Sequence, residues 1–116
     1  MNIGIDLVDI NRIKKIYKKY KKNFLNKILT ENEIAIIETI SNEKRKIEKL
    51  AGIFALKEAV IKCLNKKSSF KEICIYYDKS GKPNCKIKNN QIILSLSHEK
   101  NYAVAIAIIF DYKNKN

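Results

Sequence analysis

Two acidic residues of this chain lie in strongly apolar surroundings. Asp6 lies within IGIDLV (residues 3–8), and Glu58 lies within FALKEAVIK (residues 54–62). Flanking residues of this kind are usually buried, and a buried carboxylate is rare unless it is paired or binds a metal. Two carboxylates could share one Mg²⁺, which commonly bridges protein carboxylates to substrate phosphates. The pair therefore indicates phosphate chemistry.

Each of these acids also has a plainer interpretation. Lys62 follows Glu58 by four residues, so the two could form a helix-surface ion pair worth only about 0.3–0.5 kcal/mol. Against that, Glu58 falls on the apolar stripe of its predicted helix rather than on the solvated side. Asp6 could instead be a local cap or turn acceptor, a role that Asp9 could equally play. The spacing alone leaves these alternatives open.

The remaining polar candidates are less specific. His98 is the only histidine, and it follows LSLS (residues 94–97) at a predicted strand end. A lone histidine there is more often structural than catalytic, although imidazolium and hydroxyl donors suit phosphate oxygens. Gly81-Lys82-Pro83 is foremost a hairpin turn, and it could also present Lys82 to a phosphate. The sequence has no Walker loop, dinucleotide glycine fingerprint or zinc-ligand spacing.

A strand and a helix open the chain. Alternation predicts a strand over residues 3–8, with Asp6 on the same side as Gly4 and Val8. Asp9 is placed to N-cap the following helix. The apolar residues of this helix recur at helical spacing: Ile10, Ile13, Ile16, Tyr17 and Tyr20. The opposite side of the helix carries lysines: Lys14, Lys15, Lys18, Lys19, Lys21 and Lys22.

Two further helices are predicted after an apolar connector over residues 24–29. Thr30 and Glu33 form a capping-box pattern, which predicts the start of the second helix. Ser41 or Asn42 caps a long third helix. The apolar stripe of this third helix is Ile47, Leu50, Ala51, Phe54 and Ala55.

The second half of the chain reads as an antiparallel β-meander. Strands are predicted over residues 73–77, 85–87, 91–97 and 102–110, separated by turns at 78–83 and 89–90. Every position of the last strand is apolar, so this strand should be central and covered on both faces. The order of strand, three helices and β-meander predicts one α+β domain over residues 1–116, with a frayed tail at 111–116.

Composition restricts the function further. The chain has 116 residues, of which 46% are hydrophobic, enough for one domain with a packed core. No apolar stretch is long enough to span a membrane and no signal peptide is visible, so a cytoplasmic protein is expected. Cys63, Cys74 and Cys85 fit neither a zinc site nor a redox pair and are expected to be reduced.

The net charge of +12 comes mainly from lysine. An AT-rich genome would favour this composition, and the excess charge could also attract an acidic partner. An alternative is a small basic RNA-binding protein, which predicts basic residues and exposed aromatics on a sheet face. Because the lysines cluster on one helix and in turns, no nucleic acid partner is expected. A noncatalytic interaction module would leave Glu58 on the apolar stripe unexplained.

Five segments together resemble the small bacterial holo-acyl-carrier-protein synthases, a family of 4′-phosphopantetheinyl transferases. They are IGIDLVDI with Arg12, Leu29-Thr30 with Glu33, FALKEA with Lys62, Gly81-Lys82-Pro83, and Ser95-Leu96-Ser97-His98. Any one of them would be weak, but five in the right order and in a chain of the right length are specific. The resemblance covers nearly the whole chain.

The resemblance implies a fold of the phosphopantetheinyl transferase type, assembled as trimers with active sites between subunits. It implies transfer of phosphopantetheine from coenzyme A (CoA) to a serine of apo acyl carrier protein in fatty acid biosynthesis, with release of adenosine 3′,5′-bisphosphate. By the same resemblance Asp6 and Glu58 hold Mg²⁺, with Mn²⁺ as another possible ion. Glu58 is then the expected acceptor of the serine proton, either directly or through a metal-bound water, and Lys62 stabilises the leaving phosphate.

The resemblance also implies contacts with both substrates. The residues expected to contact CoA are Lys62, Gly81, Lys82, Pro83, Ser97 and His98. Acidic carrier proteins are expected to dock on Arg12, Lys14, Lys15, Lys18 and Lys19.

Two positions depart from the family pattern. Ile53 stands where a basic residue is frequent, which removes one expected nucleotide phosphate contact, and Asn65 replaces the usual glycine, which a left-handed helix cap tolerates.

Overall fold

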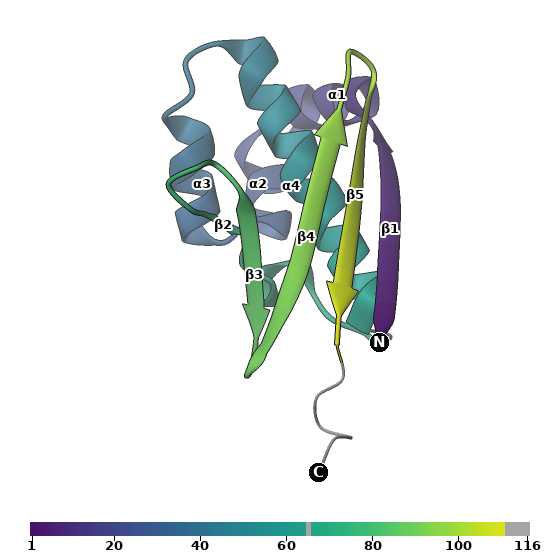
Figure 1. Ribbon diagram of the computed structural model, residues 1–116. Coiled ribbons are helices and arrows are strands. Elements are labelled where there is room, and N and C mark those ends of the chain that lie inside the picture. The colour runs from purple at the N-terminus through teal and green to yellow at the C-terminus, as the bar shows by residue number, and fades with distance from the viewer. Residues whose placement is uncertain (65, 111–116) are drawn as a thin grey trace.

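The computed structural model describes residues 1–64 and 66–110 (Figure 1). Its elements are β1 (Asn2–Asp9), α1 (Ile10–Tyr20), α2 (Lys22–Ile28), α3 (Glu31–Glu38), α4 (Glu43–Leu64), the 3₁₀ helix η1 (Phe70–Glu72), β2 (Tyr76–Tyr77), β3 (Pro83–Ile87), β4 (Asn90–His98) and β5 (Tyr102–Ile109). The predicted α+β class and β-meander are confirmed. The described residues contain four α-helices, however, and not three.

The additional helix is α2, which lies in the segment predicted to be a connector. Its apolar residues Phe24, Leu25 and Ile28 follow helical spacing, and all three are buried. Lys21 separates α1 from α2 with a φ of 47°. Because this break is made by a lysine and not by glycine or proline, the sequence carries no ordinary signal of where one helix ends and the next begins.

The predicted helix caps are present. Asp9 Oδ1 accepts a hydrogen bond from the amide two residues further on, at 2.9 Å, and starts α1. Thr30 and Glu33 form a complete capping box at α3, in which Thr30 N donates to Glu33 Oε1 at 2.8 Å. Of the two candidates for α4, Asn42 is the cap, since its Oδ1 accepts from Arg45 N at 2.9 Å.

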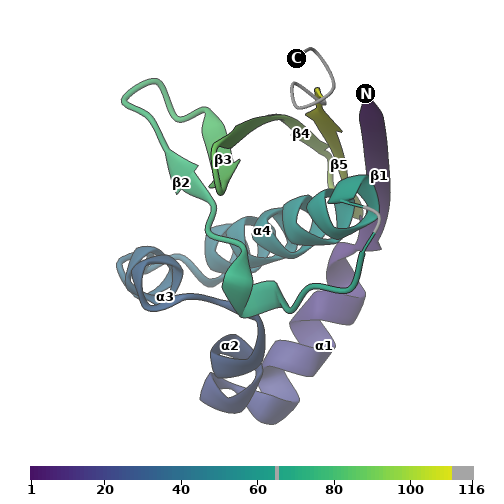
Figure 2. The same cartoon turned by 90° about the horizontal axis from the view of Figure 1, so that it is seen from below.

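The five strands form one antiparallel sheet in the order β1-β5-β4-β3-β2. The first strand therefore pairs with the last, so Asp6 lies opposite Ala105, which in turn lies opposite Leu96 of β4. Helix α4 runs across one face of the sheet, and α1, α2 and α3 lie beyond it (Figures 1 and 2). We call the face that α4 covers the inner face.

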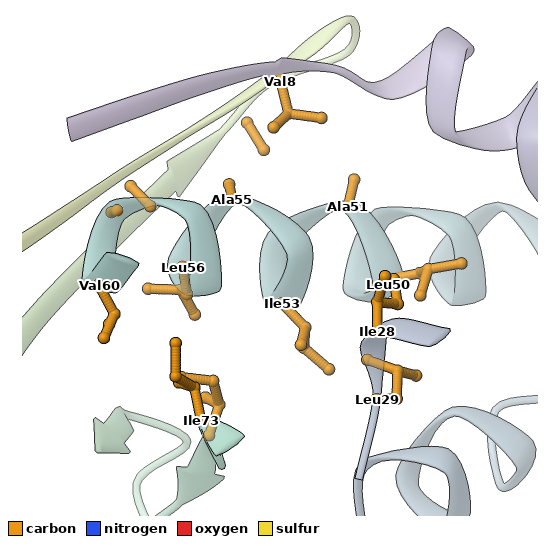
Figure 3. Packing of buried hydrophobic residues seen from close by; sticks show 14 of the residues in the cluster. Val8, Ile28, Leu29, Leu50, Ala51, Ile53, Ala55, Leu56, Val60 and Ile73 are labelled. Atoms are coloured by element: carbon orange, nitrogen blue, oxygen red, sulfur yellow. The ribbon is translucent and has the colours of Figure 1, made fainter. Parts of the chain in front are cut away.

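The hydrophobic core surrounds α4, which is buried on almost all sides along its middle turns. Ala51 and Ala55 point toward the sheet, where their small side chains allow close packing (Figure 3). Ile53 and Leu56 point the other way, and Ile73 packs below Leu56. Burial on both sides of α4 explains why the predicted apolar stripe covers only part of the buried surface of this helix.

Two predictions about the β-meander are wrong in detail. Only the last two residues of segment 73–77 form a strand, because the amide of Ile75 donates to Glu33 Oε2, at 2.6 Å, and not to a neighbouring strand. In the β3–β4 hairpin the left-handed residue is Lys88, with a φ of 55°, and not the asparagine pair at 89–90. The pairing of β3 with β4 extends to residue 90, which shifts the turn toward Lys88.

The opposite, outer face of the sheet is open. The last strand was expected to be covered on both faces, which is wrong within one chain, since buried alanines of β5 alternate with more exposed residues. Likewise Ile5 and Leu7, the neighbours of Asp6, are 56% and 65% exposed. The reason is that the helices pack on the inner face only. The apolar outer face comprises Ile3, Ile5, Leu7, Ile93, Tyr102, Val104, Ile106 and Ile108.

Other predictions concern cysteines, membrane spans and the ends of elements. Cys63, Cys74 and Cys85 are free thiols, as expected. Among the described residues, no helix is long and apolar enough to cross a membrane. The proposed cap at Asn65 and the tail at 111–116 lie outside the described residues.

Candidate functional site

Asp6 is held near α4 by an unusually close approach of β1 to that helix. Gly4 precedes it on the inner face, where a Cβ atom would overlap the carbonyl oxygen of Ala59 and lie 2.7 Å from the amide nitrogen of Cys63. Only glycine permits this approach without moving the helix. Asp6 therefore lies beside the second half of α4, with 13% of its side chain exposed.

Lys62 contacts Asp6 from the last turns of α4. Its Nζ donates to Asp6 Oδ1 at 3.1 Å and to the carbonyl oxygen of Ile5 at 3.0 Å. The ion pair between Lys62 and Glu58, which their spacing allowed, is not among the salt bridges of the described residues. Because the Lys62 side chain is 53% exposed, its ammonium group remains accessible to an anion from solvent.

Glu58 lies one turn before Lys62 and is half-buried. Burial raises the pKa of its carboxyl group above the ordinary 4.5, the charge of Asp6 raises it further, and Lys62 and Arg12 lower it. Charges influence one another this way only over short distances in a partly buried site. The structure thus brings together two acidic side chains, Asp6 and Glu58, and two basic side chains, Arg12 and Lys62. We call these four residues the Asp6 cluster.

The Asp6 cluster has the donor chemistry of a magnesium site. Its carboxylates, from Asp6 on β1 and Glu58 on α4, are hard oxygen ligands of the kind that Mg²⁺ prefers. The described residues hold no group of three or more His, Cys, Asp and Glu side chains suited to a metal. Two carboxylates leave coordination positions for water and substrate phosphate, as is usual for Mg²⁺. The repulsion that raises the pKa of Glu58 is relieved when a cation lies between the two acids.

A second polar region is a cleft of about 680 Å³ between the start of α4, the β2–β3 hairpin and the end of β4. Gly81, Pro83 and His98 line this cleft, so the structure brings these three predicted CoA contacts together. Lys82 and Ser97 are not part of its lining. Successive residues of a strand point to opposite faces, so Ser97 lies on the outer face while His98 faces inward.

The cleft and the Asp6 cluster are separate within one chain. Lys49 of α4 lines the cleft, whereas Glu58 of the same helix belongs to the Asp6 cluster. Glu58 is about 13 Å farther along the helix axis. Asp6 lies on β1 and His98 on β4, with β5 between them. Four of the six predicted CoA contacts therefore divide into Lys62 at one location and Gly81, Pro83 and His98 at the other, while Lys82 and Ser97 belong to neither.

The predicted carrier-binding residues form a continuous basic surface along α1. Lys14, Lys15, Lys18 and Lys19 are all exposed, and the exposed Arg12 connects them to the Asp6 cluster. The outer face of the sheet is mainly aliphatic. It therefore lacks the basic and aromatic pattern that the RNA-binding alternative predicted, and the described residues give that alternative no support.

A buried ion pair between Lys57 and Glu33 was not predicted from the sequence. Both side chains are 0% exposed, and Lys57 Nζ also donates to the carbonyl oxygens of Ile28 at 2.7 Å and Phe70 at 3.0 Å. Burial lowers the pKa of Lys57, whereas its bond to Glu33 raises it. The only sequence signal was a lysine within an apolar helix segment, and the capping role of Glu33 concealed its second partner.

The chain is similar in sequence to known proteins over almost its whole length. The sequence profile of the 4′-phosphopantetheinyl transferase superfamily matches residues 2–107. The chain is 45% identical over 111 residues to the holo-[acyl-carrier-protein] synthase of Thermodesulfovibrio yellowstonii, covering 92% of this chain and 96% of that protein. It is 42% identical over 120 residues to the protein of the same name from Chloroherpeton thalassium, with coverage of 94% and 97%.

Solved structures are similar over almost the whole fold. A holo-(acyl-carrier-protein) synthase from Bacillus anthracis in complex with CoA (3′,5′-ADP) is 36% identical and superposes with a TM-score of 0.84, covering 93% of this chain and 94% of that one. The Helicobacter pylori holo-[acyl-carrier-protein] synthase in complex with coenzyme A is 32% identical, with a TM-score of 0.81 and coverage of 93% and 99%.

Proposed function

The chain belongs to the 4′-phosphopantetheinyl transferase superfamily, and we propose that the Asp6 cluster is its transfer site. The activity is that of a holo-[acyl-carrier-protein] synthase, which transfers phosphopantetheine from CoA to apo acyl carrier protein. The family and reaction predicted from the sequence motifs are thereby confirmed. The observation that carries the site assignment is the convergence of Asp6, Glu58 and Lys62 from two elements distant in sequence.

We infer that Asp6 and Glu58 hold Mg²⁺, with Mn²⁺ as a second suitable ion. When bound, such an ion neutralises the CoA diphosphate and polarises the phosphorus under attack. Lys62 places a positive charge beside Asp6, where its ammonium group can bind and stabilise the leaving phosphate. This role is supported by the exposure of its ammonium group.

Glu58 is the proposed acceptor of the proton released by the attacking serine. Glu58 lies half-buried on α4 beside Asp6 and Lys62, so its carboxylate would be next to the hydroxyl that attacks the phosphorus. Replacing Glu58 by glutamine is expected to lower the transfer rate by about 100-fold or more at saturating Mg²⁺. An unchanged rate in a variant that still binds Mg²⁺ would remove Glu58 from this role.

We propose that the complete site forms between copies of the chain in a homotrimer. One CoA molecule has a diphosphate for the Asp6 cluster and a nucleotide end for the cleft, and these two regions are apart within one chain. A neighbouring subunit would supply the missing half. Neighbouring strands of the outer face expose large apolar side chains, including Ile5, Leu7 and Ile93, as is typical of an interface, and Ser97 lies on this face.

Carrier binding is expected to be more sensitive to salt than CoA binding. Docking on α1 involves exposed charges, which are screened when added salt shortens the Debye length from about 10 Å at 0.1 M to about 3 Å at 1 M. Over this range we expect the Kd for apo carrier to rise at least about tenfold and the Kd for CoA to rise much less. Calorimetric titrations at both salt concentrations measure the two affinities.

A variant provides the control for this salt experiment. Changing Lys15, Lys18 and Lys19 together to glutamine is expected to weaken carrier binding at low salt and to remove most of its salt dependence. CoA binding should be unaffected, because these lysines lie outside the cleft and the Asp6 cluster. Equal salt sensitivity of the carrier and CoA affinities would contradict docking on this surface.

Intact-mass spectrometry tests the proposed function directly. Apo acyl carrier protein is incubated with the enzyme, CoA and Mg²⁺, and a mass increase equal to one phosphopantetheine group is expected. The increase should disappear without metal and with Asp6→Ala. No increase with several apo carriers, from a protein that is folded, would contradict the proposal.

We further propose that the protein is a cytoplasmic enzyme of fatty acid biosynthesis. The three free thiols support this location.

A further inference from the structure

The cleft contains charged residues that the proposed mechanism does not use. Arg45 and Lys49 lie on successive turns of α4, and both line the cleft together with His98. Glu48 is the only acidic residue of this lining among the described residues. The positive charges of Arg45 and Lys49 therefore exceed the single negative charge of the walls, and the cleft favours an anionic ligand.

Lys49 is a cation without an anionic partner. Its Nζ lies 3.5 Å from the centre of the Tyr77 ring, and no carboxylate of the described residues lies within salt-bridge distance of it. Burial lowers the pKa of Lys49 and raises that of Tyr77, so the ring faces the ammonium group as a neutral phenol. The Tyr77 hydroxyl is buried and has no hydrogen-bond partner in the described part of the chain. The ring positions Lys49 but leaves its charge unneutralised.

Ile53, one turn after Lys49, cannot contribute to the cleft. It is 0% exposed and points into the core, away from the sheet (Figure 3). This is the position where the family resemblance implied a basic residue and a nucleotide phosphate contact. Lys49 precedes Ile53 by four residues on the same helix, and it does line the cleft.

We propose that Lys49 binds the 3′-phosphate of CoA in this protein, in place of the basic residue absent at Ile53. The inference rests on the proposed function. CoA carries a diphosphate and a separate 3′-phosphate, and once the diphosphate is assigned to the Asp6 cluster, the 3′-phosphate is the anion left for the cleft. Tyr77 acts as a positioning residue that holds the ammonium group in the cleft before the ligand arrives.

Two ligands that differ by one phosphate test this inference. Calorimetry would give the Kd of CoA and of 3′-dephospho-CoA for the wild-type protein and for Lys49→Met, which keeps the length of the side chain. Loss of a charge-assisted hydrogen bond predicts about tenfold weaker CoA binding, with the dephospho-CoA affinity changed less than about twofold. Lys46→Met is the matched control, because Lys46 lies on the same helix outside the cleft and should alter neither affinity.

The outcomes separate this inference from the proposed function. Lys49→Arg should keep the preference for CoA over dephospho-CoA, and its thermal midpoint would show that position 49 tolerates replacement. If Lys49→Met weakened both ligands equally, or neither, the assignment of the 3′-phosphate to Lys49 would be wrong while the transferase activity stood. If the wild-type protein bound neither ligand, the proposed function would fail and this inference with it.

Discussion

Replacing Asp6 by asparagine is expected to lower the transfer rate about a thousandfold. The substitution keeps the size of the side chain but removes one of the two carboxylates that would hold Mg²⁺, and metal-ion stabilisation of a transferring phosphate is worth several kcal/mol. It also replaces the anion that Lys62 Nζ contacts at 3.1 Å by a neutral amide, so Lys62 loses its ion pair and keeps only neutral acceptors such as the carbonyl oxygen of Ile5. The rate would be measured by intact-mass spectrometry of apo carrier over a range of Mg²⁺ concentrations.

The chain contains a matched control for this substitution. Asp9 lies at the end of the same strand, but its side chain caps α1 and accepts from Asn11 N at 2.9 Å. Asparagine caps helices about as well as aspartate, so Asp9→Asn should retain a rate within about threefold of the wild type. If Asp6→Asn kept the wild-type dependence of rate on Mg²⁺, Asp6 would not be a metal ligand.

Replacing Lys57 by methionine is expected to destabilise the fold by about 3–5 kcal/mol. The change leaves Glu33 as an unpaired carboxylate at 0% exposure, and it also removes the donor to the carbonyl oxygens of Ile28 and Phe70. These contacts connect α4 to the end of α2 and to η1, so their loss affects several elements at once. Urea unfolding monitored by circular dichroism measures the change in unfolding free energy.

Two further variants make this stability prediction specific. Lys22→Met removes one partner of an exposed ion pair with Glu38, 3.8 Å apart, and should cost no more than about 1 kcal/mol. The double variant Lys57→Met with Glu33→Gln should recover part of the loss, because no net charge then remains buried. If Lys57→Met and Lys22→Met had equal effects, the buried pair would not contribute as argued.

Local features of the fold could be predicted because their signals lie within a few residues. The caps at Asp9 and Asn42 and the capping box of Thr30 and Glu33 follow from side chains that bond to backbone amides at most three residues away. The segment predicted as a connector is α2. This helix was missed because the interruption between α1 and α2 lies at Lys21, where no glycine or proline marks it. The predicted strand at 73–77 was shortened for a different reason, a long-range hydrogen bond to Glu33.

The sequence by itself determined the family of the protein and singled out the residues that we propose to carry the chemistry. Asp6 and Glu58 are recognisable because charged groups seldom lie within apolar segments unless they have a partner. What the partners are, only the tertiary structure decided. Lys62 contacts Asp6 and not Glu58, Lys57 is buried against Glu33, and Gly4 allows β1 to approach α4.

The tertiary structure also decided that the predicted CoA contacts form two separate regions. Sequence motifs give no distance between them, because the separation depends on β5 inserting between β1 and β4 and on the length of α4. The same topology leaves one face of the sheet uncovered, although every residue of the last strand is apolar. Hydrophobicity specifies that a surface is to be buried, but only the packing of the whole chain shows which surfaces its own helices can cover.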